Sequence, residues 1–145
     1  MKVFFRLFVL VIVLNLIRYL IIGLIEIPLI FPYLFGEMEQ HATYFNMEFT
    51  TVDWVTSYFY NFMMWFTIVW LFHLLQPVIV GNDILKSLKV FAIAWIFFAS
   101  VSAIYMNHYS HPKDFYFWNI LDALIVFSAV ALANGILYPM VFKNR

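Results

Sequence analysis

Five polar side chains interrupt two of the most apolar stretches of this sequence. They are Asn15, Arg18 and Glu26 in the first stretch, and Asn119 and Asp122 in the last. An α-helix turns by about 100° per residue, so within each stretch these residues share one helical face. A charge at the centre of a bilayer costs about 2.5–3.5 kcal/mol on insertion scales, so such a residue rarely lacks a role.

Arg18 and Asp122 have similar expected depths, so they can meet if the first and last stretches are neighbouring helices. Direct pairing would remove two charges from lipid at once. One interpretation is a buried ion pair that fixes how the two helices dock. The other is a polar pocket, open to the outer face and joined by Glu26, that binds a headgroup, an ion or a small polar substrate. His73 is a further titratable group, and its place near the cytoplasmic end of its stretch favours an interfacial anchor over a proton relay.

Histidines and carboxylates between the apolar stretches have spacings that a metal site could use. Glu37 and His41 are four residues apart, and His108 and His111 are three apart. Imidazole and carboxylate groups are suitable ligands for Zn²⁺ or Cu²⁺. No established motif such as H-E-x-x-H is present, so ordinary solvated loops explain the same residues. If a metal is bound, we expect it at the external face, above the polar cluster.

Four long apolar segments must position these groups. The chain has 145 residues, of which 66% are hydrophobic and 11% are charged, whereas soluble domains carry about 25% charged residues. Each segment approaches the roughly 20 residues that a helix needs to cross a bilayer. The segments cover about residues 7–27, 55–75, 88–105 and 116–138, with external loops at about 36–54 and 106–115. We therefore predict an all-α fold, a four-span transmembrane helical bundle forming a single domain over residues 1–145. Pro28 and Pro32 are expected to end or kink the first helix.

The distribution of basic residues predicts the orientation of this bundle. If the helices alternate in direction, six basic residues fall on one side: Lys2, Arg6, Lys86, Lys89, Lys143 and Arg145. Lys113 alone falls on the other side. The positive-inside rule then places both termini in the cytoplasm. We expect a multi-pass integral protein of the plasma or inner membrane.

Small residues predict which helices approach most closely. In lipid, helix association depends on close packing, which small side chains permit. The fourth segment has Ala129 and Ala133, and also Ala131 and Gly135, at a spacing of four. A short turn joins it to the third segment, so these two helices should form a tight antiparallel pair. The second segment is rich in aromatic residues, which suits contact with lipid or with a partner subunit.

Three functional hypotheses follow from these features. The first is a non-catalytic subunit or assembly partner of a membrane complex, associating with other subunits or with itself. The second is a small transporter or a lipid- or ion-binding protein that uses the polar cluster between the first and fourth helices. The third is a membrane enzyme with an external His/Glu metal site. The absence of cysteine excludes thiol and disulfide chemistry, and a net charge of zero gives no reason to expect nucleic acid as a partner.

Overall fold

The computed structural model describes residues 2–109 and 112–142 of the chain, and its regular elements are helices. They are α1 (Lys2–Ile21), the π-helical turn η1 (Ile22–Glu26), α2 (Ile27–Leu29), α3 (Phe31–Gln40), the 3-10 turn η2 (Ala42–Tyr44), α4 (Thr51–Leu75), α5 (Asp83–His108) and α6 (Lys113–Phe142). Within these described ranges no residue forms a β-strand. The prediction of an all-α fold is confirmed.

Four helices are long and apolar enough to cross a membrane. They are Lys2–Leu29, which joins α1, η1 and α2, and then α4, α5 and α6, with 28, 25, 26 and 30 residues. At about 1.5 Å per residue they measure roughly 38–45 Å, more than the ~30 Å hydrocarbon core. Each span therefore tilts or extends beyond the hydrocarbon. Four candidate spans confirm the predicted helical bundle and imply contact with the lipid bilayer.

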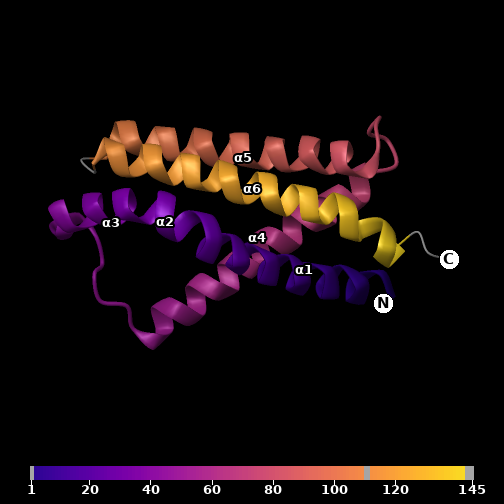
Figure 1. The fold of residues 1–145 in the computed structure, drawn as a ribbon, viewed down its shortest axis with the longest axis horizontal. Helices are drawn as coiled ribbons and strands as arrows, with labels where there is room; N and C mark the ends of the chain where they lie inside the picture. The colour runs from indigo at the N-terminus through magenta and orange to yellow at the C-terminus, as the bar shows by residue number, and fades with distance from the viewer. Residues whose placement is uncertain (1, 110–111, 143–145) are drawn as a thin grey trace.

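The two ends of the bundle differ in what they carry. The start of α1 and the end of α6 lie at one end, together with the loop between α4 and α5 (Figure 1). We call this the termini end. The end of α5, the start of α6 and the helix α3 lie at the opposite end, which we call the turn end (Figure 1). The cytoplasmic location of the termini stays a prediction.

Helices α5 and α6 form the closest pair and run side by side along their whole length (Figure 1). Ala131 is fully buried and Gly135 is buried at their crossing. A Cβ atom added to Gly135 would lie 2.5 Å from the Cα of Ile84, so only glycine permits this approach. Farther along, the indole Nε1 of Trp95 donates a hydrogen bond of 3.2 Å to the carbonyl oxygen of Ile120. The predicted tight antiparallel pair is confirmed.

The segment that follows the first span differs from the expected loop, because α3 continues as a helix to Gln40. Pro28 and Pro32 occupy early positions of α2 and α3. Pro28 lies one residue before the first span ends at Leu29, as expected for a proline that ends or kinks it. Pro32 instead lies in the first turn of α3, where its missing N–H costs nothing. Helix α3 then packs on α6, where the rings of Tyr33 and Trp118 stack with centroids 4.3 Å apart.

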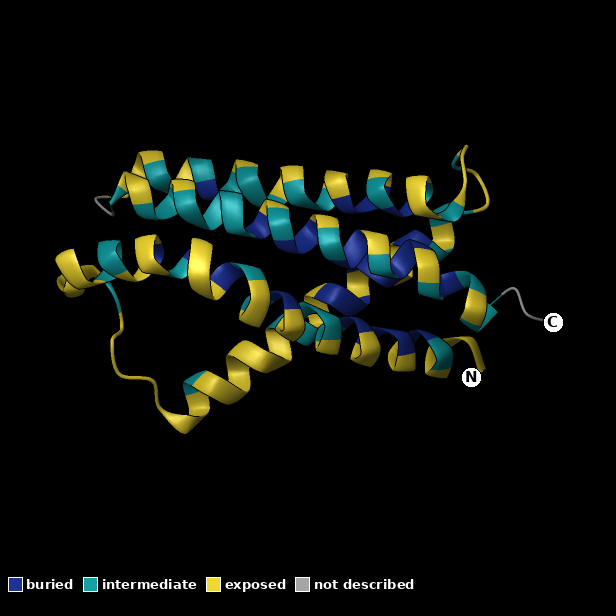
Figure 2. Cartoon of the chain, viewed as in Figure 1, coloured by how far each residue is buried: buried dark blue, intermediate teal, exposed yellow. Residues whose placement is uncertain are grey.

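The hydrophobic core is concentrated in the termini half of the bundle. Its most buried side chains include Leu10, Val11, Leu14, Trp65, Val69, Phe72, Val90, Phe91 and Val130. The first half of α4 instead diverges from the other helices and is almost entirely exposed (Figures 1 and 2). It begins with a capping box in which Thr50 and Asp53 bond each other's backbone N–H groups. The bundle is therefore closed at the termini end and more open at the turn end.

Candidate functional site

A cavity of about 180 Å³ lies where all four spans meet. Arg18 reaches it from the first span, Trp65 from α4, Phe98 from α5, and Asn119 and Asp122 from α6. One water needs about 10–15 Å³ of such space, so the cavity can hold a larger polar group. We call it the polar cavity. It brings together three of the five residues that the sequence predicts as a polar intramembrane cluster.

Arg18 and Asp122 interact electrostatically, but in the described part of the chain they form no direct ion pair. The Asp122 Oδ1 atom is buried and has no hydrogen-bond partner among these residues. The Arg18 guanidinium lies over the ring of Tyr19, 5.6 Å from its centroid, and so stays close to its own helix. The interpretation of a directly bonded ion pair between the two helices is therefore not supported. The two charges face a common space instead.

Glu26 is a second carboxylic acid beside this cavity. It is 1% exposed and ends the π-helical turn η1. Its Oε1 atom has no hydrogen-bond partner in the described ranges. It interacts electrostatically with both Asp122 and Arg18. Single π-helical turns inside α-helices often mark functional sites, and this one changes the rotation of the helix just where Glu26 is placed.

The remaining member of the predicted cluster lies apart. The Asn15 side chain donates a hydrogen bond of 2.9 Å to the carbonyl oxygen of Val11, one turn earlier in the same helix. Its amide is thereby satisfied locally and does not line the polar cavity. The structure thus groups Arg18, Asn119 and Asp122 around one space, places Glu26 next to them and separates Asn15.

An apolar groove of about 660 Å³ adjoins the polar cavity and runs between α4 and α5. The groove and the cavity share three lining residues, Met64, Phe98 and Phe127. Apart from Tyr60 and Thr67, the side chains that line the groove are hydrocarbon or thioether. We call it the α4–α5 groove. The polar cavity therefore lies directly beside an apolar groove at the surface of α4 and α5, and these three side chains line both.

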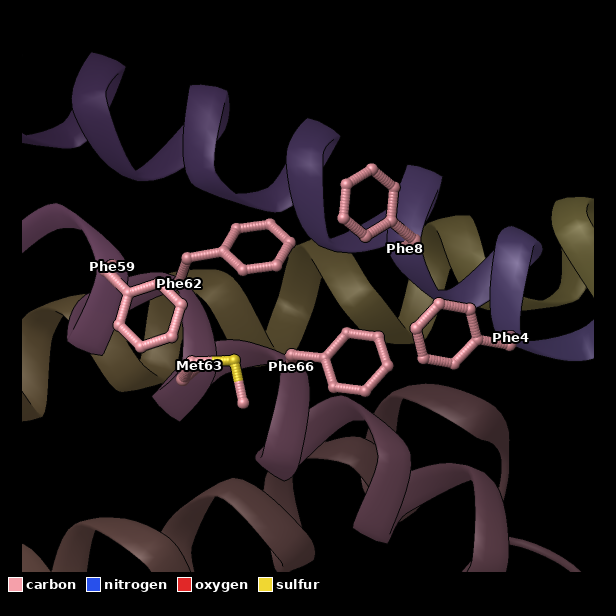
Figure 3. Close-up of a pocket in the computed structure, with 6 residues that line it drawn as sticks. All are labelled: Phe4, Phe8, Phe59, Phe62, Met63 and Phe66. Carbon is pink, nitrogen blue, oxygen red and sulfur yellow. The ribbon is translucent and has the colours of Figure 1, made fainter.

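A second groove, of about 460 Å³, lies between α1 and α4 and has no polar lining residue. Figure 3 shows phenylalanine rings from the two helices facing each other across it. The ring centroids of Phe4 and Phe66 are 5.3 Å apart, as are those of Phe8 and Phe62. Such a groove suits acyl chains but offers nothing that would recognise a polar group.

The candidate metal ligands are not brought together in the described residues. Glu37 lies in α3, His41 follows its last residue, and His108 is the last residue of α5. His111 lies outside the described ranges. Those ranges hold no group of three or more histidine, aspartate or glutamate residues that could bind a metal ion. Zn²⁺ or Cu²⁺ binding here therefore stays a hypothesis from the sequence alone.

Two polar contacts at the termini end were not predicted from the sequence. The Asn134 side chain donates a hydrogen bond of 3.0 Å to the Ser87 hydroxyl, and both residues are fully buried. His73 Nδ1 lies 2.7 Å from the Tyr138 hydroxyl oxygen. Asn134 interrupts the fourth apolar segment and was therefore visible in the sequence, whereas Ser87 lies one residue before the third predicted segment, at about residues 88–105. These contacts link α6 to α5 and to α4 within the bundle.

A bundle of four apolar helices hosts many unrelated functions, so the fold does not identify this one. The function must be argued from the polar cavity and the groove that adjoins it. Comparison of the chain with protein-family models, with curated proteins and with solved structures finds no match.

Proposed function

We propose that this protein binds a membrane amphiphile, with the headgroup in the polar cavity and an acyl chain in the α4–α5 groove. The single observation that carries the proposal is that the two spaces adjoin and share the lining side chains of Met64, Phe98 and Phe127. A ligand confined to the cavity would be a small polar molecule, and one confined to the groove would be an ordinary lipid chain. Only an amphiphile uses both.

In a bilayer, specificity for an amphiphile arises at its polar groups rather than along its acyl chain. Moving an acyl chain from lipid into an apolar groove exchanges one hydrocarbon environment for another, so the groove alone gains little. Charges such as Arg18 and Asp122 interact more strongly in a low-dielectric site than in water. Binding sites are mostly apolar concavities in which a few polar groups fix the orientation of the ligand. The cavity and groove have this distribution of groups.

Lipid retention by the purified protein tests the proposal. We expect native mass spectrometry of the detergent-purified chain to show one retained phospholipid. Ala94→Trp fills the α4–α5 groove from the α5 side. It should lower the retained fraction by about tenfold, equivalent to about 1.4 kcal/mol. Thr67→Trp fills the groove from α4 and should also lower the retained fraction of phospholipid.

Ala92→Trp is the matched control, because Ala92 is on α5 but lines a different, smaller pocket between α5 and α6. It should leave lipid retention unchanged. The proposal is wrong if the wild-type protein retains no phospholipid. It is equally wrong if the two groove variants retain as much phospholipid as the control variant.

The exposed first half of α4 favours a second candidate function, as a subunit of a membrane complex. Trp54, Tyr58, Phe59 and Tyr60 are each more than half exposed there. A helix that leaves its own bundle offers large aromatic side chains to a neighbouring protein, where they contribute most to binding. Purification in a mild detergent should then recover a larger complex. A monodisperse single chain would contradict this candidate.

A further inference from the structure

Two residues that line the polar cavity carry buried polar atoms without a partner among the described residues. One is a donor, the Nε1–H of Trp65, and the other is an acceptor, the Oδ1 of Asp122. Trp65 is only 2% exposed, so water at the protein surface does not reach its indole. An unsatisfied buried polar group is strongly unfavourable. A ligand of this cavity should therefore both accept and donate hydrogen bonds.

The charges around the cavity restrict the ligand further. One guanidinium, that of Arg18, interacts electrostatically with two carboxyl groups, those of Asp122 and Glu26. A purely anionic headgroup would pair with Arg18 and leave both carboxyl groups without a cation. A cation in the ligand would let at least one of these buried carboxyl groups stay ionised, so a ligand that also carries a positive group fits this site best.

The walls of the cavity favour a cation at the same place. Trp65, Phe98 and Phe127 contribute aromatic rings to its lining. The faces of aromatic rings attract ammonium groups, and tryptophan does so most strongly. Because the free acceptor atom on Asp122 requires an N–H or O–H donor, a primary ammonium fits better than a quaternary one, which has no hydrogen to donate.

We propose that the bound amphiphile is a zwitterionic phospholipid with a primary ammonium group in its headgroup. Its phosphate lies at Arg18 and the Trp65 indole N–H, and its ammonium lies at Asp122 with Glu26 nearby. The assignment rests on the proposed amphiphile binding and adds the headgroup class. Phosphatidylethanolamine has this chemistry, phosphatidylcholine lacks the N–H donor, and phosphatidylglycerol lacks the cation.

A competition experiment tests the headgroup directly. The whole 145-residue chain is equilibrated with equal amounts of these three lipids, matched in their acyl chains, and the retained lipid is identified by native mass spectrometry. We expect phosphatidylethanolamine to exceed each of the others by about tenfold, the effect of one charge-assisted hydrogen bond. Asp122→Asn should abolish this preference while some phospholipid remains bound. Arg18→Gln should reduce the retained amount of all three lipids to a similar degree.

Asp114→Asn is the control, because Asp114 is an exposed carboxyl on α6 away from the cavity. It should keep the wild-type preference. If Asp122→Asn does not fold, Glu26→Gln should reduce the preference instead. Equal retention of the three headgroups, or a preference that survives both carboxyl substitutions, overturns the headgroup assignment and leaves amphiphile binding intact. Failure to retain any phospholipid overturns both.

Discussion

Replacing Gly135 with alanine should destabilise the bundle, although alanine is the better helix former. A Cβ at this position would lie 2.5 Å from the Cα of Ile84, 3.0 Å from its backbone nitrogen and 3.1 Å from the carbonyl oxygen of Asp83. All three atoms belong to the backbone. No side-chain rotation can relieve the contact, so the first turn of α5 must move away from α6.

The size of the effect follows from two opposing contributions. Glycine within a helix is less favourable than alanine by about 0.5–1 kcal/mol, so the substitution gains that amount locally. Overpacking a well-packed contact costs about 1–3 kcal/mol. Gly36→Ala isolates the first contribution, because Gly36 lies within α3 and an added Cβ there has no atom within 4 Å. The difference between the two variants should therefore be about 1–3 kcal/mol.

The assay is reversible unfolding of purified protein in mixed micelles of a mild detergent and dodecyl sulfate, followed by tryptophan fluorescence. The free energy of unfolding should fall for Gly135→Ala and rise slightly for Gly36→Ala. If Gly135→Ala is as stable as Gly36→Ala, the backbones of α5 and α6 do not approach each other closely at Gly135. The proposed close crossing would then be refuted.

Two hydrogen bonds at the termini end give further predictions. Ser87→Ala should lower the free energy of unfolding by about 0.5–2 kcal/mol, because it leaves the buried amide of Asn134 without its partner. Ser100→Ala is its control and should have almost no effect, since that exposed hydroxyl bonds only to a carbonyl of its own helix. Tyr138→Phe should also lower the free energy of unfolding by about 0.5–2 kcal/mol through loss of the contact with His73. The same micellar unfolding assay measures all three.

Tyr60→Phe is the control for the tyrosine substitution, because Tyr60 is 70% exposed. Its free energy of unfolding should match that of the wild type. A loss of stability as large as that of Tyr138→Phe would show that the hydroxyl contact with His73 contributes nothing. Likewise, equal stabilities of the two serine variants would contradict the buried bond between α5 and α6.

For the polar residues of the candidate site, the sequence predicts which helical face each one occupies. Helical periodicity put Arg18 and Glu26 on one face of the first span, and Asn119 and Asp122 on one face of the last. Periodicity gives rotation within one helix, but it does not give the distance between two helices. That distance depends on the crossing of the first span with α6, and the result is a shared cavity rather than a direct ion pair.

The architecture was determined by the sequence itself. Long apolar segments must span lipid as helices, because hydrocarbon offers backbone groups no other hydrogen-bond partners. The small residues near Gly135 also predicted that α5 and α6 pack closely. The reason is that the size of a side chain limits how near two helix backbones can come.

The tertiary structure alone decided three features that matter for function. It gave Trp65 of α4 a place beside the charges of α1 and α6, it placed the polar cavity beside the α4–α5 groove, and it left the first half of α4 outside the bundle. Each depends on how whole helices tilt and cross. Tilt is set by the packing of many side chains at once, so no single residue or spacing in the sequence encodes it.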